Sequence, residues 1–185
     1  AAAVSDENHG LAGFARSSRL AIGDTAVLED PLLRVLPLTG LAAIEGVACD
    51  GALGVELFKR AVVTIDYARA RLTLAPSCGF VPPVGAVTLP LVFHAHFPAV
   101  DGELDGVAGQ FWPDTGNRNE LTLWTPFVEA HPRRDTYRAG AETTIGWGVG
   151  GAVTGRVAHA QRLALGPLEI AAPVVTLPSR RDGVT

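Results

Sequence analysis

The chain has 185 residues, of which 48% are hydrophobic and 18% are charged, and its formal net charge is −4. A chain of this length and apolar content can bury a core, so a disordered protein is not expected. Because the net charge is negative and Lys and Arg form no long cluster, nucleic acid is not expected as a partner. Pro, Gly or a charged residue interrupts every apolar run, so no membrane span is predicted.

The 21 Gly and 13 Pro residues predict a mostly β chain in which short strands are joined by many turns. One short helix is expected near 55–60, because Leu57 and Phe58 would face the core and Lys59 and Arg60 suit a helix C-terminus. In the first half of the chain, apolar segments bounded by Gly, Pro or Asp predict strands at 15–23, 24–30, 32–36, 62–67 and 72–74.

A proline-containing stretch, Pro76 to Pro83, predicts a linker at 79–83. After it we expect two strands joined by a turn, then a helical turn, a glycine-rich hairpin and two further strands. These segments are 87–97 and 103–112 around a turn at 98–102, then 126–131, 143–151, 153–165 and 168–177.

The motif with the clearest chemistry is Asp114-Thr115-Gly116, which lies between two apolar segments. Asp and Gly favour a tight turn, so we expect a carboxylate at a loop tip between two strands. Backbone N–H groups can fix such a carboxylate beside a cleft, where it can activate water. A three-residue motif also occurs by chance, so an ordinary turn is the alternative interpretation.

Two parts of the chain carry the same order of residues at an offset of about 143 positions. The matched pairs are Gly13 with Gly155, Arg19-Leu20-Ala21-Ile22-Gly23 with Arg162-Leu163-Ala164-Leu165-Gly166, and 31–37 with 173–178. This shared order predicts a duplicated structural element, and chance similarity of two apolar strands is the alternative. A true duplication would place the counterpart of Asp114 before Ala1, so the chain would begin and end within a repeat.

The segment Asp50-Gly51-Ala52-Leu53-Gly54-Val55-Glu56-Leu57-Phe58-Lys59-Arg60, followed by Val63-Thr64-Ile65-Asp66-Tyr67, resembles the closing half of a retropepsin-like aspartic peptidase lobe. In that family an apolar-apolar-Gly triplet, here Ala52-Leu53-Gly54, passes beneath the active-site loop and leads into a short helix. Residues 111–123 resemble the opening half of a lobe, and 145–151 lie where the family carries its flap. The resemblance covers nearly all of 13–178 and is closest to bacterial two-lobed aspartyl-peptidase-like proteins.

The resemblance implies a mostly β fold of the acid-peptidase type, a closed β-barrel with one short helix near 55–60. Residues 1–78 would form the closing half of a first lobe, and 84–185 the opening half of a second lobe. The implied activity is that of an aspartic endopeptidase, in which two aspartates activate water and neither a metal nor a cofactor takes part. The implied site residues are Asp114, Thr115 and Gly116 for catalysis and Ile145, Gly146, Trp147 and Gly148 for binding a polypeptide substrate.

Two departures from the family pattern leave an alternative open. Asn117 stands where the family usually has Ser, Thr or Ala, and its amide could donate to the carboxylate in place of a hydroxyl. A second Asp-Thr-Gly does not occur, so the second aspartate must come from outside this segment or from a second copy in a homodimer. The alternative is a non-catalytic retropepsin-like module for peptide binding or dimerisation. The resemblance favours an exported or periplasmic location, although the segment carries no address signal.

Two pairs of residues have metal or redox chemistry to consider. His94 and His96 lie on one face of a predicted strand, where they could bind a metal together with His131. Without a third ligand at a typical spacing, two surface or partly buried histidines are expected, and no metal site is predicted. Cys49 and Cys78 match no zinc or redox spacing. Two buried free thiols are expected, and one disulfide in an exported protein is the alternative.

Overall fold

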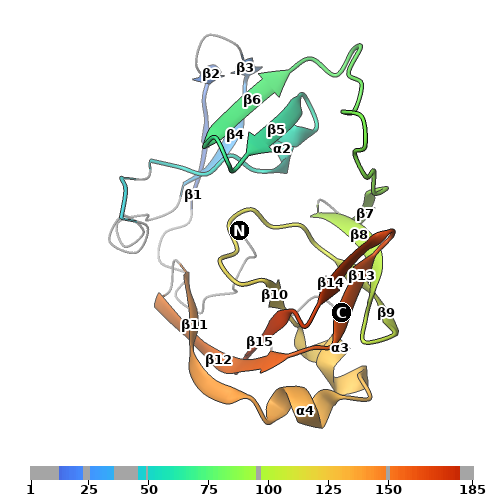
Figure 1. Ribbon diagram of the computed structural model, residues 1–185. Coiled ribbons are helices and arrows are strands. Elements are labelled where there is room, and N and C mark those ends of the chain that lie inside the picture. The colour runs from blue at the N-terminus through green and yellow to red at the C-terminus, as the bar shows by residue number, and fades with distance from the viewer. Residues whose placement is uncertain are drawn as a thin grey trace. The chain divides into compact units, whose positions relative to one another are not determined.

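The structure is a computed structural model, and it describes residues 13–22, 26–35, 46–48, 50–94, 97–148 and 151–179. The described chain is mostly β, as the sequence predicts (Figure 1). It divides into two compact units, and each is described by itself. The described residues of unit 2 lie within Asn8–Val84 and those of unit 1 within Gly85–Thr185, so the division falls directly after the predicted linker at 79–83.

The described residues of unit 1 form two sheets. The first is antiparallel with the order β14-β13-β8-β7, and β9 also pairs with β8. The second has the order β10-β15-β12-β11, in which β10 and β15 run parallel and the other pairs run antiparallel. The strands are β7 (Val92–His94), β8 (Phe97–Leu104), β9 (Val107–Phe111), β10 (Leu121–Thr122), β11 (Ala141–Gly148), β12 (Gly151–His159), β13 (Arg162–Leu165), β14 (Leu168–Ala171) and β15 (Val174–Pro178).

Two short helices of unit 1, α3 (Thr125–Ala130) and α4 (Arg134–Arg138), follow β10, and α4 packs on β12 and β15 (Figure 1). Pro126 stands in the first turn of α3, where its fixed φ suits a helix start. The helices and both sheets enclose one hydrophobic core. Its buried members are Leu104, Leu123, Val128, Tyr137, Ala160, Leu163, Val175 and Leu177.

The expectation of a single short helix is wrong, because three short helices lie in the described residues. Helix α3 covers most of the helical turn predicted at 126–131, whereas α4 was not predicted. Its sequence is polar apart from Tyr137, so it carries no apolar periodicity. Tyr137 is 0% exposed, and burial of its ring stabilises this helix, which has no apolar periodicity in its sequence to predict it.

The turn predicted at 98–102 is also wrong, because these residues lie inside β8. The chain reverses instead at Asp105-Gly106, where φ is 50° and 80°, values typical of the tight turn that joins hairpin strands. Gly102 marks a close approach of strands and no turn. A Cβ at Gly102 would lie 2.5 Å from the carbonyl oxygen of Ala164 on the neighbouring β13.

The segments predicted as single strands at 153–165 and 168–177 are each broken by a corner. Strand β12 ends at His159 and β13 begins at Arg162, while β14 ends at Ala171 and β15 begins at Val174. Each corner moves the chain from one sheet of unit 1 to the other, since β12 and β15 belong to the second sheet and β13 and β14 to the first.

The described residues of unit 2 form antiparallel strand pairs and the helix α2 (Val55–Phe58), which confirms the helix predicted near 55–60. The pairs are β1 with β4, β2 with β3 and β5 with β6. The hairpin β5–β6 confirms the strands predicted at 62–67 and 72–74. The strands are β1 (Gly13–Arg16), β2 (Arg19–Ile22), β3 (Ala26–Glu29), β4 (Leu32–Val35), β5 (Val62–Asp66) and β6 (Arg71–Ala75).

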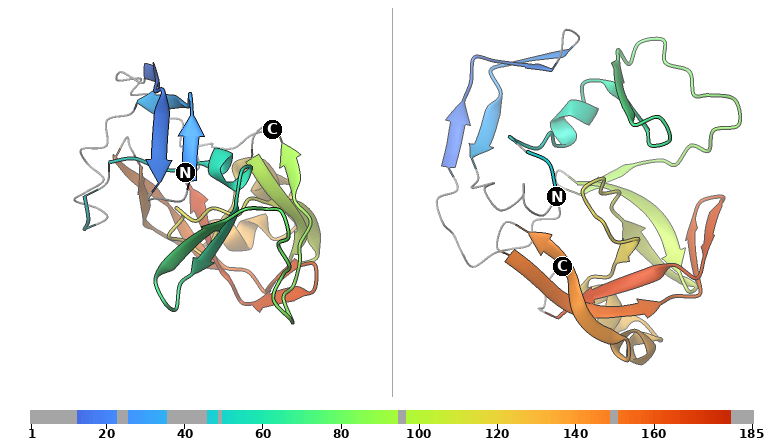
Figure 2. Two further views of the ribbon diagram at one scale, coloured as in Figure 1. Left: turned by 90° about the horizontal axis from the view of Figure 1, so that it is seen from above. Right: turned by 60° about the vertical axis from the view of Figure 1, so that its left-hand side comes forward.

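Strands β1–β4 of unit 2 and strands β12–β15 of unit 1 have the same pairing and the same register. Figure 2 shows the pairing of β1 with β4 as two blue strands that lie side by side. Residues of β1 and β2 correspond to those 143 positions later in β12 and β13, and residues of β3 and β4 to those 142 positions later. The pair Arg19↔Glu29 thus corresponds to Arg162↔Ala171. The predicted duplication therefore extends to the backbone, with Gly13 matched to Arg156 and not to Gly155.

The repeated strands differ in burial. Leu33 and Val35 of unit 2 are 36% and 50% exposed, whereas their counterparts in unit 1, Val175 and Leu177, are 0% and 7% exposed. In unit 1 these positions are covered by β10 and α4, which belong to the same core. Among the described hydrophobic residues of unit 2, Leu57 alone is buried.

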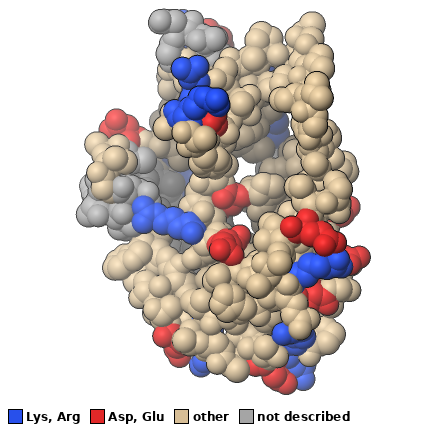
Figure 3. All heavy atoms as spheres, viewed as in Figure 1, with Lys and Arg blue, Asp and Glu red and all other residues tan. Residues whose placement is uncertain are grey.

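The predicted closed barrel is not found among the described strands, whose pairings form open sheets and two-stranded ribbons. Charged side chains are scattered over the face shown in Figure 3, with acidic and basic residues interspersed. Within the described residues, no helix is long and apolar enough to cross a membrane.

Candidate functional site

The Asp114 loop connects β9 to β10 in unit 1, so the predicted position between two strands is observed. Aromatic packing holds the start of this loop. The ring of Trp112 stacks on Phe97 with a centroid distance of 5.1 Å and an interplanar angle of 3°, and it lies 5.5 Å from Trp124. The loop therefore starts from an anchored strand end, with Asp114 two residues beyond the stacked ring.

The carboxylate of Asp114 is oriented by the backbone of its own loop. The N–H of Gly116 donates to Oδ1 of Asp114 at 2.8 Å, and the N–H of Asn117 donates to the carbonyl oxygen of Asp114 at 3.2 Å. Asp114 is half-buried and Thr115 is exposed at the tip. This geometry holds a carboxylate at the molecular surface in a defined direction.

Gly116 serves this geometry through its small size. Its φ is not in the left-handed region, so the turn itself does not demand glycine. A Cβ at this position would lie 3.3 Å from Oδ1 of Asp114, which is tighter than most Cβ contacts. Glycine therefore lets its N–H approach the carboxylate without crowding it.

The rest of the loop is tied to the second sheet by side-chain hydrogen bonds. The amide of Asn117 donates to Oγ1 of Thr122 at 3.4 Å, and its Oδ1 accepts the N–H of Asn119 at 3.1 Å. Oε2 of Glu120 accepts the N–H of Val174 at 2.7 Å. The amide of Asn117, the expected support of the carboxylate, thus donates to Thr122 of β10.

A direct link joins the Asp114 loop to the glycine-rich hairpin formed by β11 and β12. Nδ2 of Asn119 donates to the carbonyl oxygen of Ile145 at 2.9 Å. The loop and the hairpin predicted to serve as the flap are therefore neighbours in the described structure, although 26 residues separate the two bonded groups.

The predicted substrate-binding residues lie on β11 with different surroundings. The side chain of Ile145 is buried, at 9% exposure, whereas that of Trp147 is 58% exposed. Gly146 has open space where a Cβ would be, and Gly148 pairs with Gly151 near the end of the hairpin. Trp147 is thus available for a ligand, and the side chain of Ile145 packs inside.

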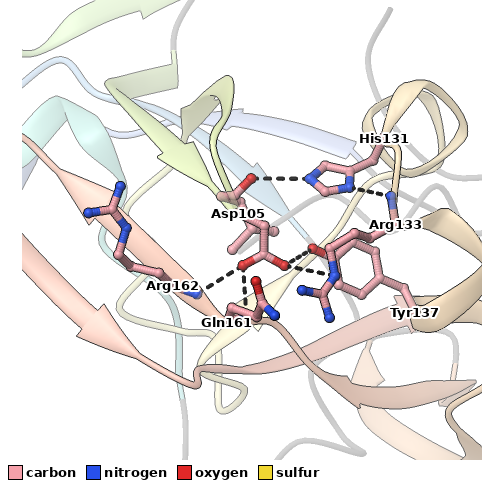
Figure 4. Close-up of polar contacts among 7 residues, drawn as sticks. Asp105, His131, Arg133, Tyr137, Gln161 and Arg162 are labelled. Atoms are coloured by element: carbon pink, nitrogen blue, oxygen red, sulfur yellow. Dashed lines mark hydrogen bonds and ion pairs between the residues drawn. The ribbon is translucent and has the colours of Figure 1, made fainter.

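A second polar cluster in unit 1, which the sequence reasoning missed, centres on Asp105 (Figure 4). Oδ1 of Asp105 accepts the N–H groups of Gln161 at 2.6 Å and Arg162 at 2.9 Å. Oδ2 accepts the hydroxyl of Tyr137 at 2.7 Å and lies 3.4 Å from Nε of Arg133. The Asp105-Gly106 dipeptide was a turn signal that could have located this residue.

Electrostatics keep the Asp105 carboxylate ionised. Burial of the side chain, which is 1% exposed, is the largest single effect and opposes ionisation. The hydrogen bonds from Arg162, Tyr137 and Gln161 and the charge of Arg133 outweigh burial, so the pKa of Asp105 lies below its ordinary value. Burial and the bond to Asp105 raise the pKa of Tyr137.

The imidazole of His131 completes this cluster (Figure 4). The backbone N–H of Arg133 donates to Nδ1 at 3.1 Å, so the proton is on Nε2, which donates to the carbonyl oxygen of Leu104 at 3.1 Å. His131 is 2% exposed. With both ring nitrogens occupied and every Asp105 oxygen accepting, we interpret the cluster as a structural clamp between the β8–β9 turn, the helices and the β12–β13 corner.

The other residues singled out in the sequence have simpler environments. His94 lies on exposed β7, while His96 lies outside the described residues. Cys78 is a free, exposed thiol, so the expectation of a buried thiol is wrong for it; Cys49 lies outside the described residues. Cys78 lies in the Pro-rich stretch 76–83, whose residues are mostly exposed, and this position explains the exposure of its thiol.

Comparison of the chain with protein-family models, with curated proteins and with solved structures finds no match.

Proposed function

We propose that this chain is part of an aspartic endopeptidase, in which Asp114 is one of two catalytic aspartates. The observation that carries the proposal is the orientation of the half-buried Asp114 carboxylate by the N–H of Gly116 at 2.8 Å, at a loop tip between two strands. The adjoining β11–β12 hairpin and the duplicated strand register support a retropepsin-like arrangement of two related lobes.

The chemistry requires a pair of carboxylates. Two carboxylates placed close together cannot both ionise at low cost, so they share one proton. The ionised member takes a proton from a bound water, and the neutral member donates to the carbonyl oxygen of the peptide bond as the water attacks. We place Asp114 in this pair, with Thr115 and Gly116 shaping its loop.

The second aspartate comes from the same loop of a second copy of the chain, or from a part of the protein beyond this segment. In a homodimer each copy contributes one Asp114, and the active site exists only in the assembled pair. This proposal links activity to protein concentration, because dissociation separates the two carboxylates.

The substrate is an extended polypeptide. The hairpin of β11 and β12 presents an exposed Trp147, whose large apolar surface suits contact with substrate side chains. Extended peptides bind proteins by pairing their backbone with strand edges, and the end of the hairpin around Gly146 and Gly148 offers such backbone groups without bulky side chains.

One observation favours a second candidate, a non-catalytic module that binds peptides or dimerises. Asn117 stands where the family usually has Ser, Thr or Ala, and its amide donates to Oγ1 of Thr122 in β10. In this alternative the fold and the exposed Trp147 are retained for binding, and the water-activating chemistry is lost.

Binding of a transition-state mimic distinguishes the two candidates. Peptides in which a secondary alcohol replaces one peptide bond resemble the tetrahedral intermediate, and a dyad binds them much more tightly than the matched normal peptides. The measurement is calorimetric titration of the wild type, Asp114→Asn and the control Asp135→Asn, which alters an exposed aspartate in the other Asp-Thr pair of unit 1.

The peptidase proposal predicts that Asp114→Asn weakens binding of the alcohol by at least about 100-fold while Asp135→Asn does not. Equal affinity for the alcohol and the normal peptide in the wild type, unchanged in Asp114→Asn, would support the binding module instead.

A further inference from the structure

Strand β11 contains one residue more than its partner between two paired positions. Thr144 pairs with Thr154 and Gly146 pairs with Val153, so Ile145 is an extra residue in a β-bulge. A bulged residue is left out of the ladder, and its backbone groups need other partners. Here the partner of the Ile145 carbonyl oxygen is Nδ2 of Asn119, at 2.9 Å.

The bulge is fixed from the inside as well. Ile145 is 9% exposed, and its Cδ1 fills the space beside Gly155, where a Cβ would lie only 2.6 Å away. The Ile145 side chain is thus held inside, and Nδ2 of Asn119 donates to the carbonyl oxygen of the same residue. The bulge therefore has one fixed orientation, held by an apolar contact on one side and by a hydrogen bond on the other.

Asn119 is itself fixed to the Asp114 loop. Its backbone N–H donates to Oδ1 of Asn117 at 3.1 Å, and the N–H of Asn117 donates to the carbonyl oxygen of Asp114 at 3.2 Å. A continuous set of hydrogen bonds thus runs from Asp114 through Asn117 and Asn119 to Ile145. The set joins the loop that carries the carboxylate to the hairpin two residues before Trp147.

We propose that Asn119 is a positioning residue that holds the β11–β12 hairpin at a fixed place relative to Asp114. The half-buried amide suits this role because an NH₂ group must point at the Ile145 carbonyl. A carboxylate of the same shape would present an oxygen to that carbonyl. The effect on substrate binding rests on the proposed peptidase function, whereas the effect on the hairpin does not.

The test of the hairpin is amide hydrogen exchange over Ala141–Gly148 and Gly151–His159 in Asn119→Ala and Asn119→Asp. The control is Gln110→Ala, which removes a side-chain amide bond of similar length, 3.1 Å to Asp101, in another hairpin of unit 1. Loss of one hydrogen bond should raise exchange near Ile145 about tenfold in both Asn119 variants, with no change in the control. Unchanged exchange near Ile145 in the Asn119 variants would overturn the proposal.

The test of the substrate effect is steady-state cleavage of a peptide by the same variants. A misplaced hairpin should raise KM about tenfold and leave kcat within about twofold, because the hairpin binds substrate in ground state and transition state alike. A purely structural loss would lower the folded fraction, and therefore the maximal rate, at constant KM; that result would contradict positioning. If the wild type cleaves nothing, the homodimer form of the peptidase proposal fails and hydrogen exchange alone decides the role of Asn119.

Discussion

Asp30 and Ala172 occupy the same place in two halves of a duplicated structure. Both have left-handed backbones, with φ of 48° and 49°, and each precedes a proline at the start of a strand. The N–H of Asp30 donates to the carbonyl oxygen of Ser18 at 3.1 Å, and that of Ala172 donates to Gln161 at 2.8 Å. Apolar strand patterns can coincide by chance, but a repeated left-handed corner in matched register indicates a true duplication.

The Ala172 corner makes a prediction for stability. Left-handed backbone is strained for most side chains, and most of all for β-branched ones, whereas Asn tolerates it. Because Ala172 is exposed, no packing change confuses the comparison. Ala172→Val should lower the free energy of unfolding of unit 1 by about 1–2 kcal/mol, and Ala172→Asn should leave it within about 0.5 kcal/mol.

Tryptophan fluorescence during denaturation measures this effect, since Trp112, Trp124 and Trp147 are the three tryptophans of the chain and all belong to unit 1. Equal stability of the Val and Asn variants would show that the backbone at 172 is not left-handed.

The Asp105 clamp predicts a larger loss. In Asp105→Asn an NH₂ group faces N–H or O–H donors whose hydrogen bonds the carboxylate accepts in the wild type. The substitution should therefore lower the free energy of unfolding by about 2–4 kcal/mol. Tyr137→Phe removes a single hydrogen bond and should lower it by about 1–2 kcal/mol. The same fluorescence measurement applies, and a Tyr137→Phe loss as large as that of Asp105→Asn would contradict the clamp as described.

The clamp also predicts how stability depends on pH. The pKa of Asp105 is lowered in the folded state, so its contribution is present above the unfolded value of about 4 and is lost as pH falls below it. The pKa of Tyr137 is raised, so its contribution is present below the unfolded value of about 10 and is lost at higher pH.

Denaturation of unit 1 between pH 7 and pH 3 should therefore show a fall in stability that is shallower in Asp105→Asn. Above pH 10, a similar fall should be shallower in Tyr137→Phe. Parallel pH curves for a variant and the wild type would rule out the assigned contribution of that residue.

The shared dyad predicts dominant inhibition. If each active site takes one Asp114 from each of two copies, adding excess Asp114→Asn to a fixed amount of wild type forms inactive mixed pairs. Cleavage activity should then fall with the added variant, while Asp135→Asn should leave it unchanged or raise it by forming active pairs. If cleavage activity does not change when Asp114→Asn is added, the second aspartate does not come from an Asp114 of another copy.

Local sequence signals were sufficient where they coincided with the packing. The helix α2 and the β5–β6 hairpin were predicted from apolar residues and turn residues that lie close together in the sequence. In the hairpin turn, Asp66 accepts the N–H of Arg69 at 3.0 Å. The Asp114 loop was likewise predictable, because Asp and Gly specify a tight turn. These features depend on contacts within a few residues.

The features that were missed depend on contacts distant in sequence. Gly102 suggested a turn, but glycine is needed there because the backbone of β13 lies close by. The contact is with Ala164, which is 62 residues later in the chain. Helix α4 is held by the burial of Tyr137 and its bond to Asp105, 32 residues away. The link from Asn119 to Ile145 is invisible in sequence because a bulge, and not a residue pattern, creates the acceptor.

The most direct measurement is digestion of a diverse peptide library by the wild type and by Asp114→Asn, from acid to neutral pH, with the products read by mass spectrometry. If two copies supply the dyad, the account predicts that the wild type cleaves within extended peptides with a specific activity that rises with protein concentration, and that Asp114→Asn cleaves nothing. The same cleavage products from both proteins would contradict the assignment of Asp114 as a catalytic residue.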